Sequence, residues 1–206
     1  RAHITGDAAE YTKAISLYEA LTKEAPGTDP HLDLLTARAF EQAGHIAEAE
    51  RRYRVIFART KSSAVANNLA FLLTNKPNTS AADLQLAETL SKLSQNAAPS
   101  DPAVLDTRGW VLLKQGHAAE ALTLFRTAVV GLSKSPQMQY HLGLASQAAG
   151  KPLWAKRHFH AAIDLGRGLK AKVDAARKAG TLLGRDIDPA DLTATTKAEA
   201  LLKAMK

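Results

Sequence analysis

Residues 102–162 read PAVLDTRGWVLLKQGHAAEALTLFRTAVVGLSKSPQMQYHLGLASQAAGKPLWAKRHFHAA, and one pattern of small, aromatic and turn residues occurs twice within them. Six residues recur with a constant displacement of 34 positions. They are Pro102, Gly109, Gly116, Ala121, Phe125 and Ala128, which recur as Pro136, Gly143, Gly150, Ala155, Phe159 and Ala162. A repeat of about 34 residues is typical of a two-helix unit, so the stretch predicts stacked helix pairs.

Each residue type in the pattern has a physical reason. Pro102 and Pro136 suit the first turn of a helix, where the missing N–H costs nothing. Gly116 and Gly150 are expected to end the first helix of each pair in a left-handed conformation. Small residues allow two antiparallel helices to approach closely, and aromatic rings fill the space toward the next pair.

The repeat extends beyond residues 102–162. Ala49, Tyr53 and Ile56 follow Gly44 by 5, 9 and 12 residues, and Ala121, Phe125 and Ala128 follow Gly116 by the same offsets. Gly166 and Gly168 are expected to break the chain before a further helix. We therefore predict a single array over residues 1–206. Its parts are an N-terminal helix (7–24) that is the second helix of a partial repeat, repeats at 30–60, 63–94 (irregular), 102–133 and 136–166, and C-terminal capping helices (169–205).

Composition agrees with an all-α protein. Hydrophobic residues make up 46% of the 206 residues but aromatic residues only 5%, which suits closely packed helices better than a β-sandwich. The absence of cysteine excludes disulfides, zinc–thiolate sites and a cysteine nucleophile. No apolar run reaches the length of about 20 residues that spans a bilayer. The chain begins with Arg1 rather than methionine, so we expect a fragment or a processed form.

These motifs resemble the tetratricopeptide repeat (TPR), and the resemblance covers nearly the whole chain. It implies a right-handed α-solenoid, a superhelix whose first helices line a concave groove that binds a peptide or a partner segment. It also implies an adaptor without catalysis or cofactor. A narrower likeness lies in residues 67–73 (NNLAFLL) and 101–112 (DPAVLDTRGWVL), which are similar to bacterial TPR lipoproteins of exosortase (PEP-CTERM) and exopolysaccharide-export systems.

The register of the repeat predicts which residues face the groove. The residue after the small contact residue on each first helix is expected to point inward, and others follow one or two turns away. The candidates are Arg38, Gln42, Asn67, Phe71, Asn75, Asp106, Trp110, Lys114, Tyr140, Leu144 and Lys178. An aromatic centre flanked by amides and charges suits an extended or helical segment, so a protein or peptide partner is predicted. The alternative interpretation is that Phe71 and Trp110 only pack against neighbouring helices, in which case their replacement would leave binding unchanged.

The narrower likeness leads us to expect a role in the bacterial envelope or periplasm, and a cytoplasmic location stays open. An enzyme would have to use the histidines. However, His158 and His160 are two residues apart on a helix, which turns them to different faces and prevents them from sharing a metal ion. His160 and Asp164 have i, i+4 spacing, but the sequence offers no third ligand. We therefore expect neither a metal site nor catalysis.

A second hypothesis concerns the basic C-terminal third. The whole chain carries a net charge of +7. Residues 151–185 contain nine cations and only two acids, Asp164 and Asp174, so the net charge of this segment equals that of the whole chain. This surface could dock an anionic polymer or a membrane surface. No aromatic platform is interleaved with the cations, so we do not expect nucleic acid as the partner.

Overall fold

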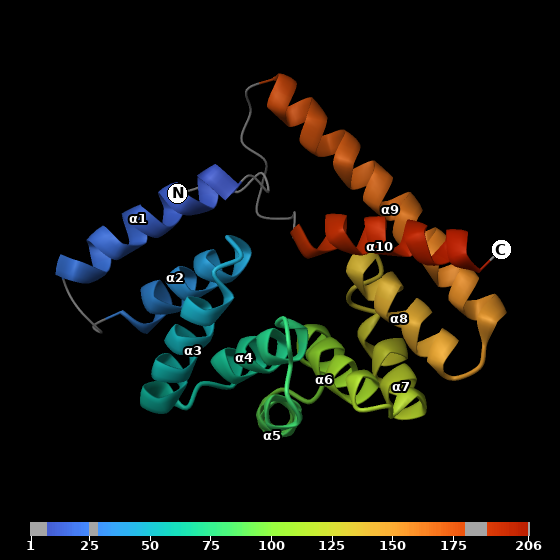
Figure 1. Cartoon of the computed structure of the whole chain (residues 1–206), viewed down its shortest axis with the longest axis horizontal. Coiled ribbons are helices and arrows are strands. Elements are labelled where there is room, and N and C mark those ends of the chain that lie inside the picture. The colour runs from blue at the N-terminus through green and yellow to red at the C-terminus, as the bar shows by residue number, and fades with distance from the viewer. Residues whose placement is uncertain (1–7, 25–28, 180–188, 206) are drawn as a thin grey trace. The chain divides into compact units, whose positions relative to one another are not determined.

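The computed structural model describes residues 8–24, 29–179 and 189–205, and the regular structure in these ranges is entirely helical (Figure 1). The expectation of an all-α fold is confirmed. The helices are α1 (Ala8–Glu24), α2 (Pro30–Gln42), α3 (Ile46–Thr60), α4 (Ser63–Asn75), α5 (Ala81–Ala97), α6 (Pro102–Lys114), α7 (Ala118–Ala128), α8 (Pro136–Ala148), α9 (Pro152–Lys178) and α10 (Pro189–Ala204).

The chain divides into two compact units, residues 1–97 and residues 98–206. In unit 1, α2 packs on α3 and α4 packs on α5, while α1 lies against α2 and α3 against α4. In unit 2, α6 packs on α7 and α8 on α9, and α10 contacts both α8 and α9. Helices thus pair with their neighbours in sequence, as the repeat predicts. That all pairs form one continuous array stays a prediction.

The helix ends agree with the sequence pattern. The carboxylate of Asp29 accepts hydrogen bonds from the backbone N–H groups of His31 and Leu32, and Asp101 accepts one from Ala103 at 2.8 Å. Each aspartate precedes a proline in the first turn, so both helices begin with an N-cap followed by a preset backbone angle. The glycines that end first helices have positive φ: Gly44 at 82°, Gly116 at 89° and Gly150 at 70°.

The other repeated glycines serve close packing. A Cβ atom at Gly109 would lie 2.6 Å from Cε1 of Phe125, and one at Gly143 would lie 2.3 Å from Cε1 of Phe159. Both rings are fully buried. In unit 1, Tyr53 holds the corresponding place, and its Oη donates a hydrogen bond of 2.7 Å to the Glu41 carboxylate. In unit 2, the recurring glycines and rings are therefore contacts of a ring against the backbone of the paired helix.

The irregular turn between α4 and α5 replaces glycine with polar contacts. Asn78 takes the left-handed conformation at φ 59°. Lys76 Nζ lies 3.0 Å from a Glu50 oxygen and 2.8 Å from an Asp83 oxygen, and all three side chains are largely buried. The hydroxyl of Ser80 donates to the Asp83 carboxylate, which accepts from the Ser80 backbone N–H as well. One lysine thus ties α3 to the start of α5.

Replacing Lys76 by methionine is expected to destabilise unit 1 by about 2 kcal/mol at neutral pH, because the largely buried Asp83 carboxylate loses its cation and Glu50 keeps only Arg54 as a partner. The Lys76 ammonium and the Ser80 donors lower the pKa of Asp83 from 3.8 to about 2. A lowered pKa contributes stability above pH 4 that is lost as the pH falls toward 2, so the difference between the variant and the parent should shrink over that window. Urea unfolding as a function of pH measures both effects.

Lys92→Met is the matched control for this variant. Lys92 pairs with Glu88 on the surface of the same helix, so its loss should change the free energy of unfolding by less than about 0.5 kcal/mol. Equal effects of the two substitutions would contradict the stabilising role of the buried lysine.

One sequence expectation about the fold is wrong: Gly166 and Gly168 do not break the chain. Helix α9 continues through both glycines to Lys178, across the predicted boundary between residues 166 and 169. The reason lies at Gly166, where a Cβ atom would come within 1.8 Å of Oγ1 of Thr195 on α10. The glycine allows a close helix crossing and does not end the helix.

Candidate binding surfaces

In unit 1, the predicted groove residues of α4 form one stripe along the helix. Asn67, Phe71 and Asn75 are spaced four residues apart and therefore lie on one face. Asn67 and Phe71 are partly buried, and Asn75 is exposed. The Asn75 side chain donates a hydrogen bond of 2.9 Å to the Phe71 carbonyl. The buried Asn67 Oδ1 accepts no hydrogen bond from the residues that the structure describes.

Helix α2 carries two predicted groove residues. Arg38 is exposed, and Gln42 is partly buried in the last turn of the helix. Arg38 contributes positive charge near Tyr53, whose phenol pKa is nevertheless raised strongly by burial and by Glu41. Tyr53 therefore stays neutral, and Arg38 is the cation that α2 presents to solvent at this position.

In unit 2, Asp106 and Trp110 of α6 meet His141 of α8. Asp106 Oδ1 lies 2.7 Å from His141 Nδ1, and the indole of Trp110 stacks on the imidazole with 4.2 Å between ring centroids. His141 and Trp110 are buried, the latter with 5% of its surface exposed. Lys114 is exposed and holds its ammonium 4.9 Å from the centroid of the Trp110 ring. Trp110 is therefore a packing residue of unit 2.

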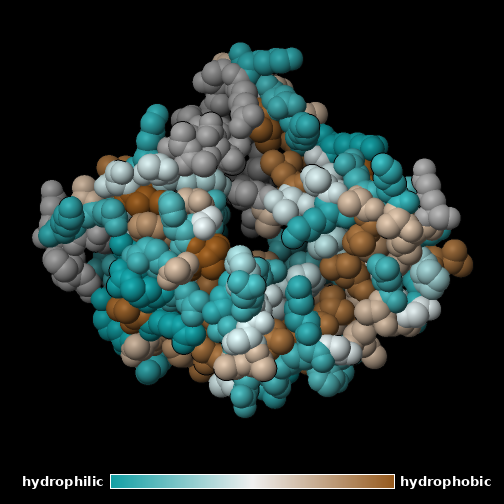
Figure 2. Space-filling view, in the orientation of Figure 1, coloured by the Kyte–Doolittle hydropathy of each residue, from teal (hydrophilic) through white to brown (hydrophobic). Residues whose placement is uncertain are grey.

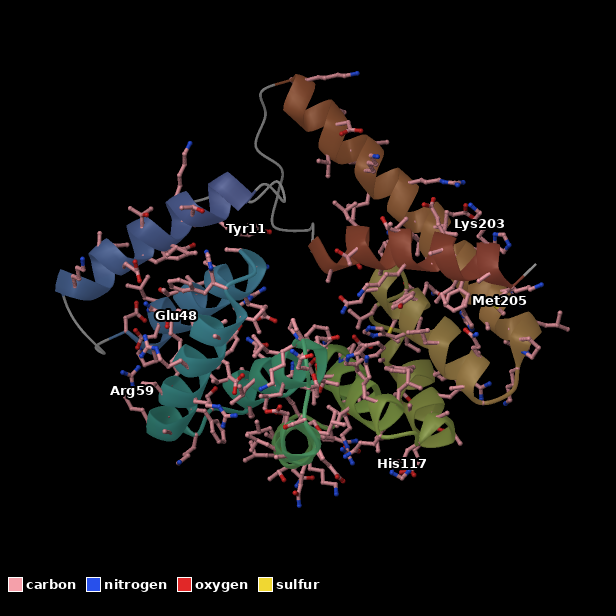
Figure 3. The ribbon with its side chains drawn as sticks, in the orientation of Figure 1. Tyr11, Glu48, Arg59, His117, Lys203 and Met205 are labelled. Atoms are coloured by element: carbon pink, nitrogen blue, oxygen red, sulfur yellow. The ribbon has the colours of Figure 1, made fainter. Side chains whose placement is uncertain are left out.

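Helix α10 covers the predicted groove residues of α8. Tyr140 and Leu144 are partly buried against a cluster that includes Phe159 of α9 and Ala198 of α10. Met205, at the C-terminal end of α10, packs against the same cluster (Figure 3). At the other end of α10, Asp191 accepts hydrogen bonds from the Ser135 hydroxyl and the Gln137 backbone N–H. Burial of Tyr140 raises the pKa of its phenol.

Comparisons with known proteins agree with this architecture. No family model matches the chain. It is 32% identical over 117 residues to the TPR repeat-containing protein PA4667 of Pseudomonas aeruginosa. The match covers 54% of this chain, which spans only 19% of that relative.

Two solved structures establish the fold. The crystal structure of TTC0263, a thermophilic TPR protein of Thermus thermophilus, has a TM-score of 0.65 against this chain at 20% sequence identity. The match covers 82% of this chain and 91% of the TTC0263 chain. MamA (41-end) of Desulfovibrio magneticus RS-1 is 16% identical to this chain and has a TM-score of 0.58. The match covers 77% of this chain and 87% of the MamA chain. The chain has the tetratricopeptide-repeat fold. That α2, α4, α6 and α8 are the first helices of the TPR units stays a prediction from the repeat.

The TPR assignment corrects the place of Lys178. The sequence put Lys178 on a separate first helix, but it is the last residue of the continuous helix α9, and its side chain is exposed. It therefore does not correspond to Phe71 or Trp110. The cause is again the glycine pair, whose sequence pattern predicts a helix break.

The sequence did not single out His141. It lies 34 residues after Thr107, which is buried in the preceding TPR unit, so the repeat register places position 141 in the core. A histidine at a position that the repeat places in the core could have marked His141 as unusual. Its partner in the structure is Asp106.

His158 and His160, which the sequence singles out, form no joint site. His158 Nδ1 lies 2.9 Å from the Gln139 oxygen, while His160 is exposed. Burial, together with the nearby Arg157 and Arg126, lowers the pKa of His158. Within residues 8–24, 29–179 and 189–205, no three histidine or acidic side chains are grouped to hold a metal ion.

Proposed function

We propose that this protein is a non-catalytic scaffold that binds a segment of a partner protein along the first helices of its TPR units. The observation that carries the proposal is the stripe on α4, where Phe71 lies between two amides one turn to either side. A partly exposed ring supplies apolar area, and amides can satisfy the backbone groups of a bound segment.

A cation on α2, in the same unit as the stripe, indicates the chemistry of the partner segment. The side chain of Arg38 is exposed there. We therefore expect a segment with an apolar anchor and acidic residues, since exposed cations mainly add specificity and association rate. The fold supports such a role through its paired helices, and the solved TPR relatives support the fold.

Replacing Phe71 by alanine is expected to weaken peptide binding by about 30-fold, the effect of losing an aromatic hot spot. Peptides would be selected from a random displayed library on the purified chain, and the affinity of a selected peptide measured by fluorescence anisotropy. Asn75→Ala, at an exposed position, should cost about fivefold through a lost hydrogen bond.

Phe57→Ala is the matched control, because Phe57 is a partly buried ring on the second helix α3 with the Lys61 ammonium 5.6 Å away. It should leave affinity unchanged. Retained binding by Phe71→Ala, or an equal loss in Phe57→Ala, would contradict binding on the stripe. Circular dichroism of each variant separates a loss of binding from a loss of folding.

We further propose that the scaffold works in a bacterial envelope assembly, such as a polysaccharide or protein export system. The Pseudomonas relative supports a bacterial source, and the likeness of residues 67–73 and 101–112 to export lipoproteins supports the envelope. None of the helices in the described ranges is both long and apolar enough to cross a membrane. Recovery of the native protein in the cytoplasmic fraction after cell fractionation would contradict this proposal.

A further inference from the structure

The first turn of α9 carries two adjacent large apolar side chains that point into solvent. Leu153 has 82% of its surface exposed and Trp154 has 51%. In the space-filling view, hydrophobic surface lies over α8 and the start of α9 (Figure 2). Burying either side chain would be favourable, so their exposure calls for a reason beyond the stability of unit 2.

The repeat itself shows that the TPR scaffold does not need these residues. The positions 34 residues earlier, in the first turn of α7, are Ala119 and Glu120, and both are exposed. A glutamate there also interacts favourably with the positive end of the helix dipole. Helix α9 has no acidic residue in its first turn and has Trp154 where α7 has Glu120. The start of α9 thus differs from the start of α7 in having a more apolar and more cationic surface.

Cations surround the apolar pair. Lys151 and Arg157 are exposed, Lys156 is partly exposed, and the Arg157 guanidinium lies 5.6 Å from the centroid of the Trp154 ring. No aspartate or glutamate occurs between residues 151 and 163. Arg126 of α7 adds positive charge beside His158, and Glu120 is the acid at the start of α7. We call Lys151, Leu153, Trp154, Lys156 and Arg157 the α9 tip.

The geometry points to the α9 tip as a docking surface for an anionic lipid bilayer, with Leu153 and Trp154 entering the boundary between headgroups and acyl chains. The side chains protrude at a helix start, so they suit insertion into a soft interface. Tryptophan favours that boundary, because its ring is apolar and its N–H can still reach water. The cations complement anionic headgroups, and with only two apolar anchors the attachment is weak and reversible.

This inference uses other residues than the α4 stripe and does not depend on peptide binding. The test is flotation of the purified chain with vesicles of phosphatidylcholine alone and with vesicles rich in phosphatidylglycerol. The chain should float with the second only. The chain has two tryptophans, and Trp110 is buried, so a blue shift of the emission on vesicle addition should come from Trp154 and vanish in Trp154→Phe.

Leu153→Ala/Trp154→Ala should lower partitioning by about tenfold or more. Arg157→Ala should lower it by about fivefold, the effect of one cation near an anionic surface. The double variant should fold, because the sister helix has alanine and glutamate at these positions. The apolar control is Val130→Ala, at an 83% exposed valine just after α7, and it should bind like the parent.

Lys170→Ala/Lys172→Ala is the charge control, since both lysines are exposed on the distal half of α9. It should retain most of the binding. Three results would overturn the inference. They are no flotation of the parent with anionic vesicles, unchanged flotation of the Leu153/Trp154 double variant, and loss of flotation in the Lys170/Lys172 double variant. Equal competition by a soluble polyanion without any shift of Trp154 emission would point to a general anion surface and would also overturn it.

Discussion

Trp110→Ala should lower the free energy of unfolding of unit 2 by about 3–5 kcal/mol, the cost of deleting a large buried ring. Trp110 is 5% exposed and stacks on His141, so its removal leaves a cavity beside the imidazole that is hydrogen-bonded to Asp106. The Asp106–His141 contact would then lose its apolar cover and become hydrated. Urea unfolding followed by circular dichroism measures the change.

Trp154→Ala is the matched control, because the same chemical change at a half-exposed site leaves no cavity. It should change the free energy of unfolding by less than about 0.5 kcal/mol. If Trp110→Ala were as stable as Trp154→Ala and only a bound peptide were lost, Trp110 would be a groove contact, and the packing interpretation would be wrong.

The contrast between Phe71 and Trp110 shows what the sequence could predict about the candidate site. Both residues follow a small residue at the same register, so the repeat assigns them the same direction. Their surroundings differ because position 141 is a histidine that stacks on Trp110 and pairs with Asp106. A register predicts where a side chain points, but only the packed structure shows what covers it. Binding by Phe71 therefore stays a prediction, whereas Trp110 belongs to the packing of unit 2.

Sequence was a better guide to the fold, since the helix ends follow local rules. Aspartate before proline, glycine after the first helix and glycine opposite a ring each act over a few residues or at a fixed offset. The cover on Tyr140 and Leu144 could not be predicted in this way. It depends on α10, which lacks the repeat pattern and is tied to α8 through Asp191.

The two glycines of α9 should respond to alanine with opposite signs. Gly168→Ala is expected to stabilise unit 2 by about 0.5–1 kcal/mol, because the position is helical, exposed and has no atom within 4 Å of a new Cβ. Gly166→Ala is expected to destabilise it by about 1–3 kcal/mol, because the new methyl group would overlap Thr195. Both free energies come from urea unfolding.

A second substitution in α10 tests the cause of the Gly166 effect. Thr195→Gly removes the side chain that a Cβ at residue 166 would strike, so the Gly166→Ala penalty should fall to near zero in its background, a coupling that a double-mutant cycle measures. If both glycine variants were destabilising and uncoupled from Thr195, the two positions would be acting as a break between helices, as the sequence pattern predicts. If the two alanine variants change the free energy of unfolding with opposite signs, Gly166 is the contact that lets α10 approach α9. The burial of Tyr140 and Leu144 of α8 beneath α10 then depends on this glycine.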